Sequence, residues 1–468
     1  MKSIDEACAR RIMTSREIDA ARPEPPPVDH QAALAAAQAR MVATGQWNAS
    51  QIMGRRWPIG CVALEITQRC NLDCTACYLS EHAEAVKDLP LEEVFRRIDR
   101  IFDHYGPNTD VQVTGGDPTL RKRAELVAII RRIRDKGMRP TLFTNGIRAR
   151  RDLLRELVDA GLVDVAFHVD MTQQRKGYAD EISLNALRQE YIERARGLRL
   201  AIMFNTTVFN GNFEQVPEVV AFFVRNSDAV RLASFQLQAE TGRGVLGRRD
   251  PRITIASVAR QIERGADATL SFDSAHAGHA RCNRHAMALV INGKVYDMLD
   301  DQALFHAVLE RTAKLQFDRQ DRSVAVRIFA KCMLGSSSLT RRGAAWLLRK
   351  LWHARGDLLH ARGHVDKLTF FIHDFMDACS LEKERIDACI FTTATSEGPI
   401  SMCLHNARRD TFVLQPVRLH DGNGFWNPLS NAVTPQPAPV PQPIQLHRNA
   451  VKGRRKRARN DGRQAGCG

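Results

Sequence analysis

Val62-Ala-Leu-Glu-Ile-Thr-Gln-Arg-Cys70-Asn-Leu-Asp-Cys74-Thr-Ala-Cys77-Tyr78 carries an apolar run directly into three closely spaced cysteines. The residues at 62–67 predict a short strand, and the C-x3-C-x2-C spacing places three thiols in the loop after it. Tetrahedral zinc sites usually take four protein ligands, built from C-x2-C pairs. Closely grouped cysteines also hold iron–sulfur clusters, and a 4Fe-4S cluster bound by three cysteines leaves one iron open to another ligand. By itself the stretch also fits three structural thiols or a zinc knuckle.

Beyond this strand the chain alternates short apolar runs with amphipathic segments. We expect strands at 62–67, 110–114, 140–144, 163–169, 200–208 and 230–238. We expect helices at 91–105, 121–136, 150–160, 181–197, 214–226 and 254–264. Six strand–helix units favour an α/β fold with a parallel sheet covered by helices. Six units are too few for a closed eight-fold barrel, so we expect a partial (β/α)6 TIM barrel, with a doubly wound sheet as the alternative.

Four regions are expected along the chain. Residues 1–60 form a preamble with an Ala-rich helix at 31–43, and 61–265 form the core. Residues 266–420 break the alternation and are expected to form a separate C-terminal α+β domain, and 421–468 a disordered Pro-rich and basic tail. Within 266–420 we expect hairpins at 285–297 and 389–403, and helices near 301–332, 338–355 and 366–377.

Composition sets limits on the class of protein. The 468 residues are 44% hydrophobic and 26% charged, close to the values of soluble globular proteins. These values exclude a wholly disordered chain, a coiled coil and a collagen-like fibre, and no apolar run approaches the ~20 residues of a membrane span. The N-terminus, Met-Lys-Ser-Ile-Asp-Glu, lacks the apolar region of a secretory signal. We therefore expect a cytoplasmic protein whose cysteines bind metal or act in catalysis rather than form disulfides.

The formal net charge of +15 invites a nucleic-acid interpretation. Between Arg448 and Gly468 there are eight Lys or Arg and one Asp, so +7 of the excess lies in one short tail after a Pro-rich stretch. The other +8 is expected to be spread thinly over the body. The tail is either a solubilising appendage or a contact for RNA, DNA or another anionic surface, and nucleic acid is expected only through this tail.

Two further motifs stand at the ends of expected strands. Gly115-Gly116-Asp117-Pro118 ends the second strand, and Thr144-Asn145-Gly146 ends the third. In parallel α/β folds ligands bind beyond the carboxyl ends of the strands, so both motifs and the cysteine loop are expected at one edge. A pair of glycines allows backbone to approach a ligand closely, and the Asp and Asn side chains can bind polar groups.

This combination resembles the radical S-adenosylmethionine (SAM) superfamily, over about residues 60–265. The resemblance implies that Cys70, Cys74 and Cys77 hold a 4Fe-4S cluster and that Gly115, Gly116 and Asp117 meet the methionine ammonium group of SAM. Asn145, which can hydrogen-bond a ribose or a carboxylate, is a further candidate for binding the cofactor. In that family an electron from the cluster cleaves SAM to methionine and a 5′-deoxyadenosyl radical. The usual acid of the motif is Glu, so Asp117 is a departure that leaves its direct contact in doubt.

Strand alternation suggests further positions that face the ligand. On the fourth expected strand His168 and Asp170 share one face, and Gln238 lies on the corresponding face at the end of the sixth. Asn205 is a weaker candidate on the fifth strand. Buried polar groups need partners, so these residues either line a cavity that binds the cofactor or pair with polar residues of neighbouring strands.

The C-terminal region contains five more cysteines, at 282, 332, 379, 389 and 403. Cys389 and Cys403 lie at the two ends of the second expected hairpin. With Cys282 and either Cys379 or Cys332 they are candidates for a second iron–sulfur cluster, and isolated buried thiols are the alternative. The stretches 235–243 and 371–406 resemble the branch that includes pterin dimethyltransferase-like proteins and tetraether-lipid synthase, which carry additional clusters.

These features favour a radical SAM enzyme, an oxidoreductase or transferase that abstracts hydrogen from an unactivated C–H bond, for carbon–carbon bond formation or methylation. A reductant such as flavodoxin or ferredoxin is the expected partner, and the sequence does not name the substrate. The alternatives are a radical SAM enzyme that modifies a peptide or RNA, and a non-catalytic iron–sulfur protein that binds nucleic acid.

Overall fold

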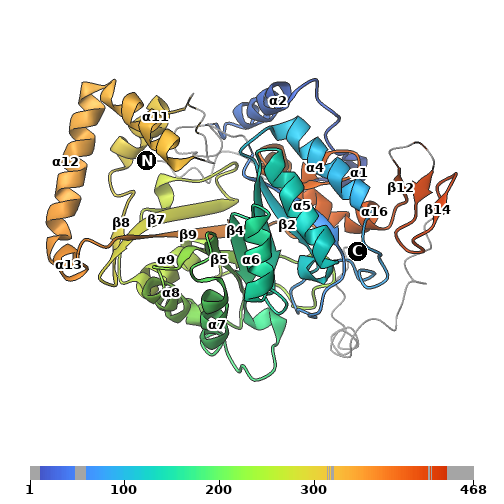
Figure 1. Cartoon of the computed structure of the whole chain (residues 1–468), viewed down its shortest axis with the longest axis horizontal. Coiled ribbons are helices and arrows are strands. Elements are labelled where there is room, and N and C mark those ends of the chain that lie inside the picture. The colour runs from blue at the N-terminus through green and yellow to red at the C-terminus, as the bar shows by residue number, and fades with distance from the viewer. Residues whose placement is uncertain are drawn as a thin grey trace.

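The protein is described by a computed structural model over residues 11–47, 59–313, 315, 317, 321–419, 422 and 424–439. Its core alternates strands and helices as expected (Figure 1). The core strands are β1 (Cys61–Thr67), β2 (Asp110–Gly115), β3 (Arg139–Thr144), β4 (Asp164–His168), β5 (Ala201–Val208) and β6 (Val230–Leu237). The core helices are α4 (Leu91–Tyr105), α5 (Arg123–Asp135), α6 (Arg151–Asp159), α7 (Asn185–Ala195), α8 (Val216–Arg225) and α9 (Ile255–Ala266). The α/β prediction is confirmed.

The sheet is larger than the six strands predicted. Its order is β11-β10-β1-β2-β3-β4-β5-β6-β9-β7-β8. The added strands are β7 (Asn283–Ile291), β8 (Lys294–Asp297), β9 (Asp366–Asp374), β10 (Phe391–Ala394) and β11 (Pro399–Ser401). β10 runs parallel to β1 and β9 runs parallel to β6, so eight neighbouring strands of the described chain are parallel. The outer strands β11 and β8 do not pair with each other, so the barrel is open over the described residues.

One predicted helix of the C-terminal region is wrong. Residues 366–377 contain β9, whose side chains alternate in burial, with Leu368, Phe370 and Ile372 fully buried. The segment is rich in aromatic and β-branched residues, and it lies between β6 and β7 in the sheet. Two sheet neighbours outweigh the weak helical periodicity that the sequence suggested.

Residues 266–420 therefore do not form a sheet of their own, in contrast to the separate domain that we expected. Both predicted hairpins are present: β7 and β8 turn at Asn292-Gly293, where both residues have positive φ, and β10 and β11 form the second. Both hairpins join the core sheet, one at each side. The expected helix at 301–332 is two helices, α10 (Gln302–Arg311) and α11 (Arg322–Leu334), and α12 (Ser337–His353) follows them.

The remaining elements are short or peripheral. They are α1 (Ser15–Ala20), α2 (His30–Ala43), α13 (Arg355–His360), α14 (Lys383–Asp387), α15 (Met402–Ala407), α16 (Arg409–Val413), and a small sheet of β12 (Val417–Arg418), β13 (Phe425–Trp426) and β14 (Val433–Thr434). The predicted Ala-rich helix is α2, which packs on α4. Within the described parts, no helix combines the length and the apolar character needed to cross a membrane. The expectation of a disordered tail from residue 421 is wrong for β13 and β14, which pair in this small sheet. The basic tail at 448–468, with Cys467, and also Cys8 lie outside the described residues.

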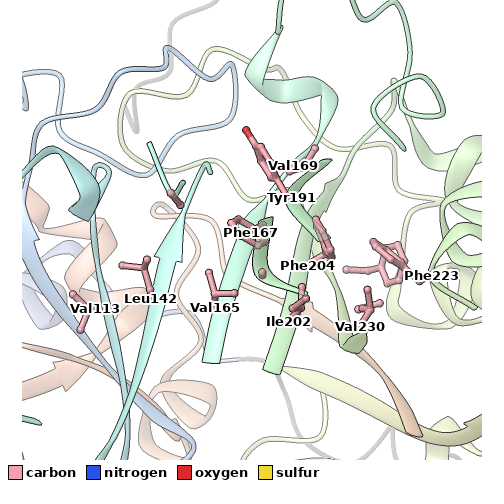
Figure 2. Close-up of a cluster of buried hydrophobic side chains, with 14 of the residues drawn as sticks. Val113, Leu142, Val165, Phe167, Val169, Tyr191, Ile202, Phe204, Phe223 and Val230 are labelled. Carbon is pink, nitrogen blue, oxygen red and sulfur yellow. The ribbon is translucent and has the colours of Figure 1, made fainter. Parts of the chain in front are cut away.

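The apolar core lies between the sheet and its covering helices. Figure 2 shows Phe167 of β4 and Phe204 of β5 side by side on this side of the sheet. The Phe167 ring centroid is 5.0 Å from that of Tyr191 on α7, and the Phe204 centroid is 5.3 Å from that of Phe223 on α8. Because side chains alternate along a strand, residues between these positions point to the inner face of the partial barrel.

Candidate active site

A cavity of about 210 Å³ lies at the carboxyl ends of the parallel strands. Nine of the predicted site residues line it: Cys70, Cys74, Cys77, Gly115, Gly116, Asn145, His168, Asn205 and Gln238. Asp117 and Asp170 do not line it, and both side chains are completely buried. Strand alternation located His168, Asn205 and Gln238, because it needed only the strand positions and a period of two, and the cysteine loop and the strand-end motifs located the other six.

The cysteine loop is surrounded by hydrogen-bond donors. The Nε of Arg243 donates to Cys77 Sγ at 3.4 Å, and its guanidinium also pairs with Glu84. Asn145 Nδ2 lies 4.0 Å from Cys70 Sγ. Burial raises the pKa of the Cys70 thiol to about 11, although the backbone N–H of Leu72 opposes the rise. Such donors suit sulfur that bears negative charge, as it does when it binds metal.

The two glycines of the Gly-Gly motif are required by the backbone of the cysteine segment. A Cβ on Gly115 would lie 2.0 Å from the carbonyl oxygen of Thr67, and a Cβ on Gly116 would lie 2.0 Å from that of Arg69. Gly115 also has a φ of +128°. The Tyr78 hydroxyl donates to the Gly115 carbonyl at 2.6 Å. The motif therefore fixes the loop that carries the thiols against the end of β2.

Asp117 has a different place from the one that the resemblance implied. Its carboxylate accepts hydrogen bonds from Thr119 N at 3.0 Å, Thr144 Oγ1 at 2.9 Å and Asn145 N at 2.9 Å. Burial raises the pKa of this carboxyl, and the bonds from Thr119 and Asn145 partly oppose the rise. Asp117 thus ties the end of β2 to the end of β3 and is turned away from the cavity, so we assign it a positioning role.

Asp170 repeats this arrangement two strands along. Its carboxylate accepts hydrogen bonds from the backbone N–H of Thr172 at 2.9 Å and from that of Thr207 at 2.8 Å, which ties the end of β4 to β5. It also accepts from His168 Nε2 at 2.6 Å. The shared signal is Asp-x-Thr after a strand, at Asp117-Pro-Thr119 and Asp170-Met-Thr172. That repeat was visible in the sequence and was not used.

His168 faces the cavity from β4. Burial lowers the pKa of this imidazole, but the Asp170 carboxylate more than compensates, so the pKa lies above its ordinary value. Asn205 Nδ2 lies 3.4 Å from His168 Nδ1 and donates to Gln236 Oε1 at 3.1 Å. Gln238 Nε2 donates to the carbonyl of Gly247 at 2.7 Å. These polar residues therefore both line the cavity and pair with their neighbours, so the two alternatives of the sequence analysis hold together.

Sequence reasoning missed a buried ion pair in the cavity wall. Arg409 Nη1 of α16 lies 2.7 Å from Glu65 Oε2 of β1, and both side chains are buried. The Arg409 guanidinium also lies 4.6 Å from the centroid of the Tyr78 ring. Burial by itself would raise the pKa of Glu65, but Arg409 lowers it to about 2. An acid inside the apolar strand Cys61–Thr67 was a signal for a buried partner, although nothing pointed to Arg409.

The donor set fits an iron–sulfur cluster better than a single metal ion. Over the residues that the structure describes, no three His, Cys, Asp or Glu side chains are grouped so that they could hold one ion. A cubane cluster takes one thiolate on each of three irons, so its ligands stand farther apart than those of one ion. Cys70, Cys74 and Cys77 face the same cavity, with no carboxylate in its lining besides the paired Glu65.

Residues 64–223 match the family described as the Radical SAM superfamily. This stretch is a radical SAM domain. The expectation drawn from the cysteine loop and the strand-end motifs is therefore confirmed for the domain.

Several curated proteins are similar to this radical SAM domain. The 7,8-dihydro-6-hydroxymethylpterin dimethyltransferase of Methanocaldococcus jannaschii is 27% identical over 215 residues, 44% of this chain and 42% of that protein. A probable GTP 3′,8-cyclase of Pyrococcus abyssi is 31% identical over 186 residues, 39% of this chain and 59% of that protein. The PqqA peptide cyclase of Bradyrhizobium diazoefficiens is 32% identical over 184 residues, 38% of this chain and 46% of that protein. The chain spans about half the length of the curated relatives it matches.

Three of the C-terminal cysteines converge behind the radical SAM cavity. Cys282, Cys389 and Cys403 line one small pocket of about 10 Å³. Arg385 Nε donates to Cys282 Sγ at 3.3 Å, and Cys389 Sγ lies 3.1 Å from the carbonyl oxygen of Phe391. Burial raises the pKa of all three thiols, and the neighbouring Cys389 raises that of Cys282 and Cys403 further.

The other two C-terminal cysteines lie elsewhere. Cys379 is disulfide-bonded, which differs from the prediction of a metal-binding thiolate at this position. Cys332 is a free, half-buried thiol on α11, 3.7 Å from the carbonyl oxygen of Arg311. Spacing along the chain could not show which of these five cysteines lie together, because their proximity depends on where β9 and β10 pair in the sheet.

Two side chains separate the three-thiol pocket from the radical SAM cavity. Phe375 and Met402 line both of them. Phe375 also lines a larger cleft of about 780 Å³ between α9 and the segment after β9. Arg385 and Asp374 are shared by this cleft and the three-thiol pocket. Phe375 is thus the one side chain, among those described, that borders all three spaces.

Proposed function

We propose that the protein is a radical SAM enzyme that binds a 4Fe-4S cluster through Cys70, Cys74 and Cys77. When bound, the cluster passes one electron to SAM, whose S–C5′ bond breaks to give methionine and a 5′-deoxyadenosyl radical that takes a hydrogen atom from an unactivated C–H bond of the substrate. The observation that carries the proposal is the single cavity at the strand ends, which contains the three thiols and both glycines of the Gly-Gly motif. A one-electron donor such as flavodoxin or ferredoxin supplies the reducing equivalent.

The chain's own residues bind and orient the cofactor in this proposal. The backbone at Gly115 and Gly116 would receive the methionine end of SAM, and Asn145 would bind its polar groups from the end of β3. His168, Asn205 and Gln238 hold the rest of the molecule from the inner face of the sheet. Since they are fixed by hydrogen bonds to one another and to backbone, they orient the ligand without reorganising.

Anaerobic reconstitution tests this function. The protein is loaded with iron and sulfide, mixed with dithionite and SAM, and assayed for 5′-deoxyadenosine. We expect 5′-deoxyadenosine from the parent and none from Cys74→Ala. Cys332→Ala is the control and is expected to form product like the parent, because Cys332 does not line the cavity. Equal product from Cys74→Ala and the parent would contradict the proposal.

We further propose that Cys282, Cys389 and Cys403 hold a second iron–sulfur cluster. Three thiols that converge from three separate segments, beside the Arg385 guanidinium, support it. The space between them is small, so binding requires the surrounding side chains to move apart. The position behind Phe375 and Met402 suits a centre that exchanges electrons with the cofactor cavity or anchors the substrate.

Iron content after reconstitution measures the second cluster. We expect about eight irons per chain for two 4Fe-4S clusters, and about four for the Cys282→Ala/Cys403→Ala variant, because that variant keeps only the SAM-binding cluster. Cys332→Ala is the matched control and retains the parent's content. About four irons in the parent, unchanged in the double variant, would show that these thiols hold no cluster.

The substrate is proposed to approach through the 780 Å³ cleft, because that cleft reaches the cofactor cavity at Phe375. Its lining mixes guanidinium groups, such as those of Arg281 and Arg284, with carboxylates, such as those of Asp273 and Glu382. Carbon–carbon bond formation and methylation are the reactions that we favour for the substrate radical. Modification of a peptide or RNA remains the alternative within the same chemistry.

A further inference from the structure

We expected the +8 that lies outside the 448–468 tail to be spread thinly. Instead, it is concentrated in one segment. Residues 322–365 contain nine Lys or Arg and a single acid, Asp357, which gives this segment a net charge of +8. With the +7 of the 448–468 tail, the two segments account for the whole +15 of the chain. All other residues together are electrically balanced. A charge so localised marks a surface that meets something anionic.

The basic segment forms the helices α11, α12 and α13, which follow α10 and precede β9. Figure 1 shows α12 at the left margin of the molecule, beyond the sheet. Among the described residues of these three helices, the only buried side chain is that of Leu339 on α12. Three helices that bury so little of their own surface have apolar area left for a partner.

One side of α12 faces the body of the protein. Trp346 Nε1 donates to Asp300 Oδ1 at 3.0 Å, and Lys350 Nζ donates to the carbonyl oxygen of Asp297 at 2.6 Å. Leu339, the buried residue, lies on the same side at helical spacing. These contacts fix which face of the helix points away from the protein.

The opposite face of α12 is apolar and exposed. Leu348 is 66% exposed and Trp352 is 70% exposed, one turn apart, and Leu347 and Leu351 are exposed beside them. Arg349, toward one flank of this stripe, pairs with Asp300 of the body at 3.4 Å, whereas the Arg355 guanidinium lies 4.2 Å from the centroid of the Trp352 ring. A surface helix normally turns such a stripe inward, so its outward direction requires an apolar environment outside the chain.

The neighbouring helices α11 and α13, which contact α12, also expose apolar side chains. On α11 Val326 is 65% exposed and Leu334 is 72% exposed, with Phe329 also exposed, and Leu359 of α13 is 79% exposed. Nine of the fifteen exposed large hydrophobic residues in the described chain lie within 322–365: Val326, Phe329, Leu334, Leu347, Leu348, Leu351, Trp352, Leu359 and Val365. Lys331 and Arg327 flank the stripe on α11. Exposed apolar side chains and basic side chains therefore occur together on each of these three helices.

Three kinds of partner fit this surface unequally. A second copy of the chain would bring +8 against +8, and that repulsion opposes association. Nucleic acid would neutralise the charge but would leave the Leu and Trp side chains in water. An anionic lipid bilayer supplies negative headgroups for the Arg and Lys side chains and an acyl layer for the apolar stripe, and its flat surface suits helices that project rather than form a groove.

We propose that the surface formed by α11, α12 and α13 docks the protein on an anionic lipid bilayer. The helices lie in the plane of the membrane surface, with Leu348 and Trp352 buried among the headgroups and the first acyl carbons. The basic side chains at the flanks pair with lipid phosphates. The active-site cavity takes no part in this contact, so docking and SAM cleavage are separate properties.

Vesicle co-sedimentation of the full chain tests the proposal. We expect the parent to partition about tenfold more strongly onto phosphatidylcholine vesicles containing about 30% phosphatidylglycerol than onto pure phosphatidylcholine. Leu348→Ser/Trp352→Ser is expected to weaken binding to the anionic vesicles about tenfold. The matched control is Val28→Ser/Val42→Ser, which removes two exposed apolar side chains elsewhere and is expected to bind like the parent. The basic tail is present in every variant, so its contribution cancels in the comparison.

Tryptophan fluorescence gives a second measurement. We expect a blue shift of the parent on anionic vesicles, and a much smaller one for Trp352→Phe, which keeps the apolar character but removes the reporter. Equal binding of the parent and Leu348→Ser/Trp352→Ser would overturn the proposal, since the tail would then suffice. Equal binding of the parent to neutral and anionic vesicles would also overturn it. A third contradicting result would be that Leu348→Ser/Trp352→Ser only converts a dimer to a monomer in light scattering. Because the substituted side chains are exposed, each variant is expected to keep the parent's melting temperature, and melting curves check that it is folded.

Discussion

Gly116→Ala is expected to lower the rate of SAM cleavage about 100-fold or more, because a displacement of roughly 1 Å in a catalytic group has an effect of that size. A Cβ at this position would lie 2.0 Å from the carbonyl oxygen of Arg69 and 2.4 Å from its carbonyl carbon. Neither atom can rotate away, since both belong to the backbone. The segment that leads into Cys70 must therefore shift, and the three thiols shift with it.

The measurement is 5′-deoxyadenosine formation per reconstituted cluster, together with the iron content of the variant. We expect the iron at the SAM-binding cluster to fall as well, because the loop that holds it has moved. Gly356→Ala is the control: nothing lies within 4 Å of a Cβ there, and the site is on the exposed helix α13. Normal activity in Gly116→Ala would show that the close approach of the two backbones does not position the cluster.

Arg409→Leu is expected to destabilise the protein by about 3–5 kcal/mol, because it leaves the buried Glu65 carboxylate without a counter-ion. The free energy of unfolding is measured by denaturant titration at pH 7. Replacing both partners, in Glu65→Leu/Arg409→Leu, is expected to restore most of the loss, since apolar side chains of similar size need no partner. Arg123→Leu is the control, because it breaks an exposed pair with Asp152 and is expected to cost about 1 kcal/mol or less.

The same pair predicts how stability depends on pH. The folded pKa of Glu65, about 2, lies below its ordinary value of 4.5. Its stabilising contribution is therefore present above pH 4.5 and is lost as the pH falls through about 2. In Arg409→Leu the unpaired carboxyl takes up a proton more readily, so the difference in stability between parent and variant shrinks as the solution is acidified. A difference that stays constant between pH 7 and pH 4 would contradict this account.

The sequence allowed the fold to be predicted in the core, where strands and helices alternate along the chain and each element can be recognised from its local pattern. β2 alternates strictly in burial, and α4, α6 and α9 bury one face at helical spacing, whereas β1 is an apolar run that is buried at every position. β9 was mistaken for a helix because its burial depends on β6 and β7, which are distant in sequence. The same long-range pairing hid the fact that residues 266–420 extend the core sheet, since local patterns carry no information on which strands become neighbours.

The candidate site was predictable to the extent that it stands at strand ends. Cys70, Gly115 and Asn145 could be placed together because parallel strands end at one edge. Asp117 and Asp170 could not be separated from the lining residues, because the direction of a side chain in a turn depends on hydrogen bonds that the sequence does not display. Arg409 could not be found because it enters from a helix more than 300 residues away from β1.

The pairing of β10 with β1 has a consequence for the order of folding. Phe391 and Cys61 stand side by side in the sheet although about 330 residues of chain separate them, and Thr393, Met402 and Arg409 complete the cavity wall from the same late segment. Contacts between such distant segments form slowly, because a long loop must close first. During synthesis from the N-terminus, the cysteine loop therefore remains open on one side until residues 391–409 have been made. The arrival of β10, Met402 and Arg409 then closes the cavity wall on that side of the cysteine loop.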